Sequence, residues 1–439
     1  MKQKKEINRR QFLKNTSICM MGGPMMLSHT KWLEKEDDSS EPPKIKEYRT
    51  IGRTGFKVSD ISAGEHHANK AMLEAMLDAG INYIDTAENY GNGRDEIAIG
   101  EVIKKRNRKS IFITSKLSLR KKYTKDSLIA RTRKCLERLQ TDYIDCMMIH
   151  GCPNVKTVKS KAFHDAMTQL KSEGRVRYVG LSNHGSNWAS DPEESMEKVL
   201  LAAAEDGRFD VMLLAYNFMA REMGEKVLKS CTEKKIGTTL MKTDPVSLYL
   251  EIKNTVEETK KEGKEVSDYY KNLLPRLEKK SVAGVYFMKQ FNLINPKEIR
   301  DAAIRFVLNN PHVNTVCKTY NNFDDVESYI KLSGSHYSEL DEKRLAVYSQ
   351  AYGNLYCRHA CGLCEPYCPN NVPVNTIMRY NHYFEAQRRE KHAMIKYANL
   401  PTTKADICLS CKGYCETACP YGVPVHGLLI QAHRRLTLA

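Results

Sequence analysis

The stretch Gly80-Ile-Asn-Tyr-Ile-Asp85-Thr-Ala-Glu-Asn-Tyr90-Gly91 decides how the first half of this chain folds. Residues 82–87 form a short, mostly apolar run, which predicts a buried strand. The strand ends in Asp85, and Tyr90 follows five residues further along the chain. A buried strand that carries a carboxylate near its end and is followed by a tyrosine indicates a functional site at one edge of a sheet.

The same kind of strand recurs between about residues 47 and 345, where it alternates with segments of helix length such as 124–138 and 160–173. Such alternation is typical of parallel strands joined by crossover helices, and nearly continuous apolar strands fit a sheet that is buried on both faces. We therefore expect an α/β fold, a (β/α)8 TIM barrel, with a doubly wound sheet as the alternative. No G-x-G-x-x-G motif follows the first strand, which argues against a Rossmann half. The predicted strands are 58–63, 82–87, 110–117, 143–150, 176–183, 210–217, 237–242 and 313–318.

Polar side chains stand at the ends of several predicted strands, where barrels of this class carry their catalytic groups. Each one alone has a structural explanation: an aspartate caps a helix, a tyrosine lines a pocket, and a histidine is satisfied in the core. Their coincidence at successive strand ends predicts a shared site. The residues are Asp85, Tyr90, Lys116, His150, Ser182 and Asn183.

These motifs resemble the aldo/keto reductase family. The matching segments are residues 80–91, Thr114-Ser-Lys116, the run from Leu139 through Asp145 to His150, and the opening segment 51–58. The resemblance covers about residues 47 to 332 and implies a (β/α)8 barrel that reduces carbonyl groups or oxidises alcohols. The family's catalytic tetrad falls on Asp85, Tyr90, Lys116 and His150.

The chemistry of this tetrad follows from its side chains. Reduction of a carbonyl by hydride needs a proton donor aimed at the developing alkoxide, and the phenol of Tyr90 can supply that proton. Its reference pKa is near 10, so we expect the ammonium group of Lys116 to lower it, with Asp85 holding Lys116 charged. His150 can donate a hydrogen bond to the carbonyl oxygen. General acid catalysis of this kind contributes roughly 10²–10⁴ in rate.

The resemblance also implies a nicotinamide cofactor, NADP or NAD, and a small carbonyl or alcohol substrate. It places Ser182 and Asn183 at the nicotinamide carboxamide, and Lys318 and Thr319 on the phosphate side. In the family, the loop after the first strand helps to shape the substrate pocket. The corresponding loop of this chain, residues 64–70, is shortened. Its two histidines, His66 and His67, are expected to be exposed loop residues, with substrate contact as the alternative.

Several cofactor positions depart from the family pattern. Leu213 stands where the family often has a glutamine, and Met241-Lys242 replaces an aromatic residue that stacks on nicotinamide. Asp324-Asp325 lie near the place of an arginine that holds the 2′-phosphate of NADP. Two carboxylates would repel that phosphate, so the preference for NADP is weakened, and NAD or weak cofactor binding becomes plausible.

The last part of the chain, about residues 346–439, carries eight of the fourteen cysteines in two runs that each end in Cys-Pro. Closely spaced cysteines let several thiolates meet at one metal centre, and a closing Cys-Pro is typical of bacterial ferredoxins. We expect a small, mainly helical ferredoxin-type domain with two [4Fe–4S] clusters, and the tail resembles that of aldo/keto reductases with such a domain. The runs are Cys357, Cys361, Cys364 and Cys368, and Cys408, Cys411, Cys415 and Cys419.

In ferredoxins the fourth cysteine of a run crosses to the other cluster. By that rule one cluster takes Cys357, Cys361, Cys364 and Cys419, and the second takes Cys408, Cys411, Cys415 and Cys368. The spacing departs from the ideal ferredoxin run by one residue in each half. Two zinc sites, disulfides, or one cluster beside a degenerate half are the alternatives.

The N-terminal segment Asn8-Arg9-Arg10-Gln11-Phe12-Leu13-Lys14 resembles a twin-arginine export signal, and residues 16–27 supply a weakly apolar stretch behind it. The expected organisation is a leader at 1–33, a linker at 34–46, the barrel at 47–345 with an insertion at about 243–295, and the iron–sulfur domain at 346–439. The signal predicts export to the bacterial periplasm through the twin-arginine machinery, and a chance Arg-Arg pair would leave the protein in the cytoplasm.

The composition of the chain argues against two classes of partner, nucleic acids and membranes. The net charge is +16, but no nucleic-acid motif accompanies it and the lysines are dispersed, so we expect a solvated charged surface and no nucleic-acid partner. No run of eighteen apolar residues exists, so no membrane span is expected. Two functions compete: a reductase whose clusters serve electron transfer with an unknown redox partner or serve structure, and an exported iron–sulfur electron carrier with a vestigial barrel.

Overall fold

The computed structural model describes residues 42–119, 122–184, 194–245, 295–353, 356–358, 361–385 and 389–437, with scattered residues between 253 and 275. Residues Pro42–Ala439 form one compact unit. The predicted leader at 1–33, most of the linker at 34–46 and most of the insertion at about 243–295 lie outside the described residues.

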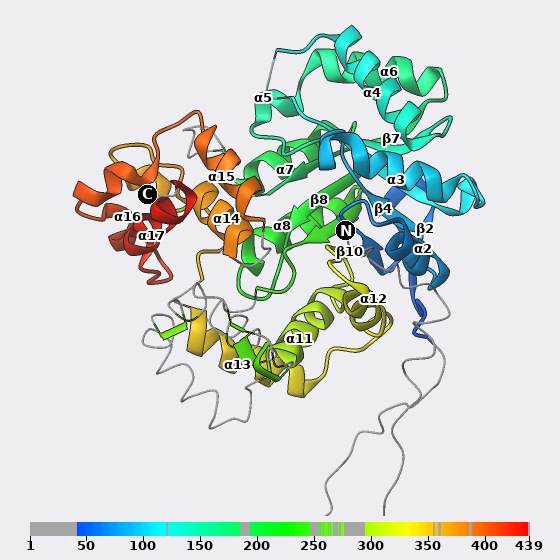
Figure 1. Ribbon diagram of the computed structural model, residues 1–439. Coiled ribbons are helices and arrows are strands. Elements are labelled where there is room, and N and C mark those ends of the chain that lie inside the picture. Colours follow the sequence, from blue (N-terminus) through cyan, green and yellow to red (C-terminus); the bar gives the residue numbers. More distant parts are fainter. Residues whose placement is uncertain are drawn as a thin grey trace, which may run out of the picture. The chain divides into compact units, whose positions relative to one another are not determined.

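Eight parallel strands close into a barrel in the order β10-β3-β4-β5-β6-β7-β8-β9 (Figure 1). The closed ring confirms the (β/α)8 prediction and shows that the doubly wound alternative is wrong, because a doubly wound sheet has two free edges. The strands are β3 (Ile61–Ala63), β4 (Tyr83–Asp85), β5 (Phe112–Leu117), β6 (Ile144–Ile149), β7 (Val176–Asn183), β8 (Val211–Ala215), β9 (Gly237–Met241) and β10 (Thr315–Lys318).

Helices cover the outside of the barrel and bury its apolar outer face. Capping side chains set the start of several of them: Thr124 caps α4 in a capping box with Ser127, and Asn69 caps α2. The helices are α2 (Lys70–Asp78), α3 (Arg94–Ile103), α4 (Lys125–Leu139), α5 (Val155–Val158), α6 (Lys161–Ser172), α7 (Met196–Asp206), α8 (Arg221–Glu233), α11 (Pro296–Leu308) and α12 (Phe323–Ile330).

A hairpin of β1 (Tyr48–Thr50) and β2 (Lys57–Ser59) lies at the amino end of the barrel. The prediction of a single strand at 58–63 was wrong, because β2 pairs with β1 and the barrel strand β3 starts only at Ile61. Fully buried Ile51 contributes to the barrel's interior core. A Cβ on Gly237 would lie 2.4 Å from the Ile51 side chain, so the hairpin needs a glycine at the start of β9.

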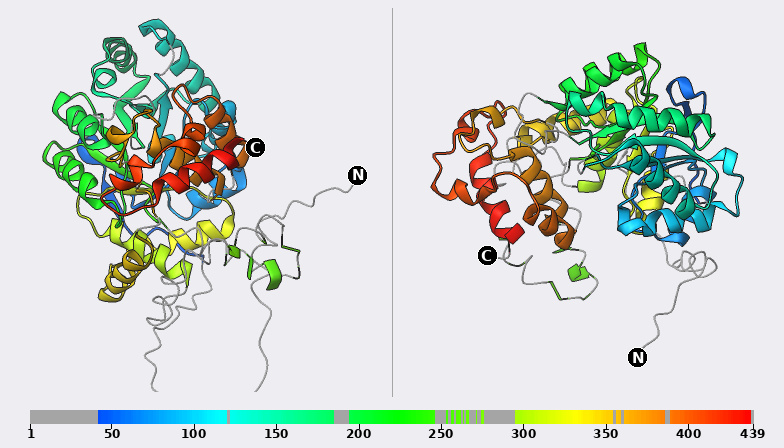
Figure 2. Two further views of the ribbon diagram at one scale, coloured as in Figure 1. Left: turned by 90° about the vertical axis from the view of Figure 1, so that its left-hand side faces the viewer. Right: turned by 90° about the horizontal axis from the view of Figure 1, so that it is seen from above.

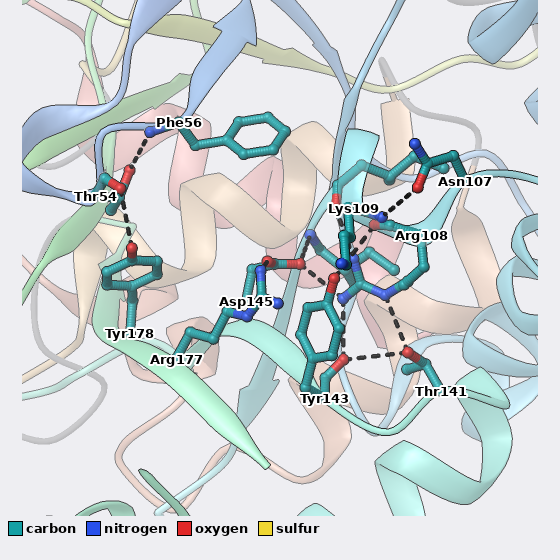
Figure 3. A network of polar contacts seen from close by, with 12 residues as sticks. Thr54, Phe56, Asn107, Arg108, Lys109, Thr141, Tyr143, Asp145, Arg177 and Tyr178 are labelled. Carbon is teal, nitrogen blue, oxygen red and sulfur yellow. Dashed lines mark hydrogen bonds and ion pairs between the residues drawn. The ribbon is translucent and has the colours of Figure 1, made fainter. Parts of the chain in front are cut away.

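A polar network surrounds Asp145 near the start of β6, at the same amino end (Figure 3). Its carboxylate is 2% exposed, accepts from the Ile113 amide at 2.9 Å, and pairs with Arg108 at 2.7 Å. The guanidinium groups of Arg108 and Arg177 lie 4.1 Å and 3.6 Å from the centre of the Tyr143 ring. Asp145, which belongs to the segment that resembles the family, therefore ties strands together at the amino end of the barrel. Residues at that end contribute to stability rather than to catalysis.

After the barrel, α13 (Glu339–Tyr352) packs on α11, with Arg305 bonded to Asp341 at 2.7 Å and 2.9 Å. The tail has a hydrophobic core of its own and is mainly helical in its described part, as Figure 2 shows in orange and red. No helix in the described residues has both the length and the apolar character of a membrane span. The tail elements are η5 (Glu365–Tyr367), α14 (Val374–Glu385), α15 (Glu390–Ala398), η6 (Ala405–Ser410), α16 (Tyr414–Thr417) and α17 (Val425–Thr437).

The tail contains an internal repeat that the sequence analysis missed. Residues 365–374 and 416–425 share the pattern Glu-x-x-Cys-Pro-x-x-Val-Pro-Val. Glu365 accepts the Asn375 amide at 2.8 Å, and Glu416 accepts the His426 amide at 3.2 Å. Each Cys-Pro therefore leads into a helix that starts in the same way, α14 in the first half and α17 in the second.

Candidate active site

Two neighbouring strands bring a carboxylate and an amine together inside the barrel. Asp85 ends β4 and is 3% exposed, and Lys116 lies in β5 and is fully buried. Lys116 Nζ donates to Asp85 Oδ1 and to the Thr86 carbonyl oxygen, the latter at 2.7 Å. Buried charges persist when they are paired and hydrogen-bonded, so this contact fixes the lysine as a cation.

Tyr90 reaches this pair from the loop after β4. It opens the short helix η2 (Tyr90–Gly93), in which Gly91, Asn92 and Gly93 have φ of 55°, 58° and 86°. Glycine and asparagine adopt such left-handed conformations most readily, which explains the residue types behind the tyrosine. Lys116 Nζ lies 4.9 Å from the centre of the Tyr90 ring.

His150 completes the group from the loop after β6. Its amide donates to the Leu117 carbonyl oxygen at 2.8 Å, and its ring centre lies 5.7 Å from that of Tyr90 at 76°. The structure thus brings together the four side chains expected to form a tetrad, and it places them at the carboxyl end of the barrel.

The direction of the Tyr90 pKa differs from our expectation. Burial raises the pKa of the Tyr90 phenol above its ordinary value, and the opposing effect of the Lys116 charge does not overcome it. Burial alone would lower the pKa of Lys116, but Asp85 and Tyr90 outweigh it and raise that pKa. In the ligand-free site the phenol is therefore protonated and the amine is charged, which is the state that a proton donor requires.

Ser182 and Asn183, the last residues of β7, hold the loop that carries His150. The Ser182 hydroxyl accepts from the Gly151 amide at 2.9 Å, and Asn183 Nδ2 donates to the Cys152 carbonyl oxygen at 3.0 Å. Both side chains are buried. Their contacts give them a positioning role toward His150, and contact with a nicotinamide carboxamide stays a prediction.

At the position predicted to bind the cofactor phosphate, the lysine already has a partner. Lys318 ends β10, and its amine forms an ion pair with Asp244 and lies 4.7 Å from the centre of the Tyr329 ring. Thr319 follows directly and is partly buried. Asp324 and Asp325 lie in the first turn of α12, and their effect on a 2′-phosphate stays a prediction. A phosphate at Lys318 would have to displace the Asp244 carboxylate.

The loop after β3 departs from the prediction for its histidines. His66 is fully buried, and its Nδ1 lies 3.3 Å from the Gly64 carbonyl oxygen, so the expectation of an exposed side chain was wrong. Its Nε2 has no hydrogen-bond partner in the described part of the chain. His67 does lie at the surface, with 42% of its side chain exposed. Substrate contact by either histidine stays a prediction.

Two residues that were not predicted to belong to the site, Lys242 and His184, lie beside it. Lys242 follows β9, has φ of 58°, and donates from Nζ to the His184 carbonyl oxygen at 3.0 Å. The His184 ring centre lies 6.3 Å from that of His150. The signal in the sequence was a lysine in place of an aromatic residue, and its meaning depended on which strand ends are neighbours.

The tail cysteines gather in two sets, and each set draws on both runs. A pocket is lined by the first set, Cys357, Cys361, Cys364 and Cys419. In the second set, burial and then the nearby thiolates of Cys415, Cys368 and Cys411 together raise the pKa of Cys408 to about 12. The first set has the membership that the crossed pattern predicts, and the ligand assignment of both sets stays a prediction.

All eight tail cysteines are free thiols, so no disulfide joins them. In the described residues, no group of three or more His, Cys, Asp or Glu side chains is arranged to hold a single metal ion. A tetrahedral zinc site with Zn–S bonds of about 2.3 Å needs its sulfurs only about 3.8 Å apart. The assignment of the two sets to a metal centre stays a prediction.

A closed (β/α)8 barrel with an Asp–Lys pair, a tyrosine and a histidine at its carboxyl end defines an oxidoreductase of the TIM-barrel class. The model of the "Aldo/keto reductase family" matches residues 53–345. The chain therefore belongs to the aldo/keto reductase family, and the match ends before the first tail cysteine.

Relatives of this family share parts of the barrel. The aldo-keto reductase YhdN of Bacillus subtilis is 28% identical over 214 residues, which are 44% of this chain and 61% of the relative. The methylglyoxal reductase DkgB of Salmonella typhi is 32% identical over 115 residues, 26% of this chain and 42% of the relative. The chain thus spans less than two thirds of either relative. The solved aldo-keto reductase AKR11C1 of Bacillus halodurans, in its holo form, shares the fold with a TM-score of 0.50 at 19% identity, over 73% of this chain and 100% of that one.

Proposed function

We propose that this protein reduces a small carbonyl compound to an alcohol, or runs the reverse reaction, with NADP or NAD as cofactor. The observation that carries the proposal is the Lys116 amine held between Asp85 and the ring of Tyr90. This arrangement uses a buried charge pair that packing alone does not require, since apolar side chains of similar volume would serve a core as well or better.

Each tetrad residue has a distinct task in this proposal. Tyr90 donates its phenolic proton to the carbonyl oxygen as charge develops there. Lys116 stabilises the phenolate that remains, and Asp85 keeps Lys116 charged and oriented. His150 donates a hydrogen bond to the same oxygen. In the direction of alcohol oxidation the proton returns to Tyr90.

The cofactor would supply the hydride when bound. The residues fit a nicotinamide dinucleotide at two places. Ser182 and Asn183 end β7 beside the His150 loop, and Lys318 is a nearly buried cation at the end of β10. Because Asp244 already neutralises Lys318, a 2′-phosphate gains less there than at an unpaired lysine. This supports NAD as an alternative to NADP.

We also propose that each set of four tail cysteines holds a [4Fe–4S] cluster. The support is the pocket lined by cysteines of both runs, which a crossed arrangement requires. Burial and neighbouring thiolates raise the pKa of Cys357, and a bound metal centre would reverse that effect, because ligating thiols must lose their protons. When bound, such clusters pass one electron at a time to an unknown redox partner, or they stabilise the tail.

Export by the twin-arginine machinery forms the last element of the proposal. It is supported by the Arg9-Arg10 motif and by the logic that clusters are inserted before a folded protein is exported. The periplasm is the expected location.

The test is anaerobic purification, followed by analysis of bound cofactors and a screen of carbonyl compounds with NADPH and NADH. Tyr90→Phe should abolish turnover while leaving cofactor binding in place. The matched control is Tyr48→Phe. Tyr48 lies in the amino-end hairpin, and its hydroxyl donates to the Gly80 carbonyl oxygen. A protein that carries clusters but binds neither nicotinamide would instead support the exported electron carrier with a vestigial barrel.

A further inference from the structure

Cationic side chains gather at the carboxyl end of the barrel, beside the proposed tetrad. Lys242 follows β9 and bonds to the His184 backbone after β7, so its side chain crosses the end of β8, which lies between them. His184 is within 6.3 Å of His150, ring centre to ring centre, and His150 faces Tyr90. A row of side chains therefore runs from Lys242 through His184 and His150 to the proton donor.

The tail adds two more such groups from α14. Arg379 is 2% exposed, and its charge acts on both Lys242 and His184. His382, three residues further along the same helix face, lies near Lys242 and Asp244. These groups of α14 lie close enough to Lys242 to affect its charge, and α14 and the barrel belong to the same compact unit.

Further contacts fix the tail against this end of the barrel. Arg389 pairs with Glu65 at 2.5 Å, where Glu65 lies in the loop after β3. Arg358 Nε donates to the Met219 carbonyl oxygen at 3.0 Å, and Asn217 Nδ2 donates to the Tyr356 hydroxyl at 3.3 Å. Met219 and Asn217 follow β8, so two loops at the carboxyl end of the barrel, those after β3 and β8, hold the tail.

The electrostatic consequence is that these buried basic groups oppose one another's protonation. Burial, followed by the charge of Arg379, lowers the pKa of Lys242 well below its ordinary value. Burial and then Lys242 lower the pKa of His382 to about 4, and the same causes, with Arg379, His150 and Lys116, lower that of His184. Asp244 faces His382, but its carboxylate is paired with Lys318. An anion placed here would gain charge-assisted hydrogen bonds and would restore protons to these groups.

We propose that Arg379, Lys242 and His184 bind an oxyanion group of the substrate, a carboxylate or a phosphate, while the carbonyl group of the same molecule lies at Tyr90 and His150. This inference rests on the proposed reductase function and names its substrate class. The tail then contributes a side chain to the substrate site of the barrel, and the bare barrel lacks a part of that site.

The test measures binding without turnover, by calorimetry on the complete cluster-loaded protein with saturating oxidised nicotinamide. The probes are levulinate against methyl levulinate, and dihydroxyacetone phosphate against dihydroxyacetone. In one of the two pairs, we expect the charged compound to bind at least tenfold more tightly than its neutral counterpart. The pair that shows this difference indicates whether the site binds a carboxylate or a phosphate. Binding of the anion should also take up protons, seen as a heat that varies with the ionisation enthalpy of the buffer.

Variants assign the effect to residues. Arg379→Met and Lys242→Met should each weaken the charged probe tenfold or more and leave the neutral probe unchanged. Arg434→Met is the matched control, because Arg434 is an exposed cation at the end of α17 in the same tail. Arg379 is buried, so its loss can disturb the tail. The effect of Lys242→Met on binding of the charged probe therefore provides a second, independent test.

Three outcomes overturn the inference. The charged and neutral probes bind equally, or the variants leave the discrimination intact, or they weaken the binding of the nicotinamide itself, which would assign these cations to the cofactor phosphates. Failure of the reductase function looks different: the charged probe binds through Arg379 and Lys242, yet no carbonyl compound is turned over.

Discussion

The amine of Lys116 is held by the carboxylate of Asp85 on the neighbouring strand and lies 4.9 Å from the centre of the Tyr90 ring. One buried cation thus serves both a structural and a chemical task. It neutralises a carboxylate inside the barrel, and it stands beside the proposed proton donor.

The two tasks can be separated by mutation. Lys116→Met should lower kcat by roughly 10²–10⁴, because the phenolate of Tyr90 loses its neighbouring cation. It should also lower the free energy of unfolding by roughly 3–5 kcal/mol, since Asp85 becomes an unpaired buried charge. The double variant Asp85→Asn/Lys116→Met should recover much of the stability and none of the activity, as measured by denaturant titration and kinetics. Recovery of activity in the double variant would contradict the assigned roles.

The pH dependence of carbonyl reduction should be flat on its alkaline side. The protonated phenol is the donor, and burial raises the Tyr90 pKa above its ordinary value near 10. The donor form therefore stays populated as pH rises, so kcat for reduction should not fall between pH 7 and about 10. A rate that declines with an apparent pKa well below that range would show that Lys116 outweighs burial once ligands are bound.

The crossed cysteine sets make a prediction about pairs of mutations. Cys357 and Cys419 belong to one set although they lie in different runs. The double variant Cys357→Ala/Cys419→Ala should therefore still retain about four iron atoms of an expected eight or so. The pair Cys357→Ala and Cys368→Ala draws on both sets although both lie in one run, and should lose both clusters. Iron and sulfide analysis decides, with Cys231→Ala, a buried barrel cysteine, as the control. The reverse result would mean that each run holds its own cluster.

Asp244 should determine the choice between the two nicotinamide cofactors. Its carboxylate pairs with Lys318, the cation expected to face the 2′-phosphate. Asp244→Asn should free Lys318 and shift the ratio of NADP to NAD affinity toward NADP by roughly tenfold, about 1.4 kcal/mol. Fluorescence titration measures this, and Asp165→Asn, which removes an exposed partner of Lys161, should leave the ratio unchanged. An unchanged ratio in Asp244→Asn would place the phosphate away from Lys318.

Asp145 should matter for stability and not for chemistry. Asp145→Ala removes the carboxylate that binds the Ile113 amide and Arg108, and leaves these partners unsatisfied near the amino end of the barrel (Figure 3). We expect a loss of roughly 3–5 kcal/mol in the free energy of unfolding. Asp142→Ala, whose side chain is 99% exposed, should change it by less than about 0.5 kcal/mol. A stable Asp145→Ala protein with impaired turnover would contradict this division.

Much of the barrel was predictable because its strands are short apolar runs with polar residues at one end. The run at 176–183 matches β7 residue for residue, and the run at 144–149 lies within the predicted 143–150. The first strand was misplaced because residues 58–63 have the look of one strand, with apolar Val58 and Ile61 in a single short run. Only their pairing partners, β1 and β10, separate the hairpin from the barrel.

The sequence by itself determined the class of fold, the four residue types of the tetrad and the two cysteine runs, because periodicity, strand ends and spacing are local properties of the chain. Tertiary structure alone decided what those residues experience. The burial of Tyr90 outweighs the charge of Lys116, Asp244 neutralises Lys318, and α14 brings Arg379 to Lys242. Each of these depends on the distance between residues far apart in the chain, and electrostatic energies depend on that distance and on the exclusion of water, which no local pattern encodes.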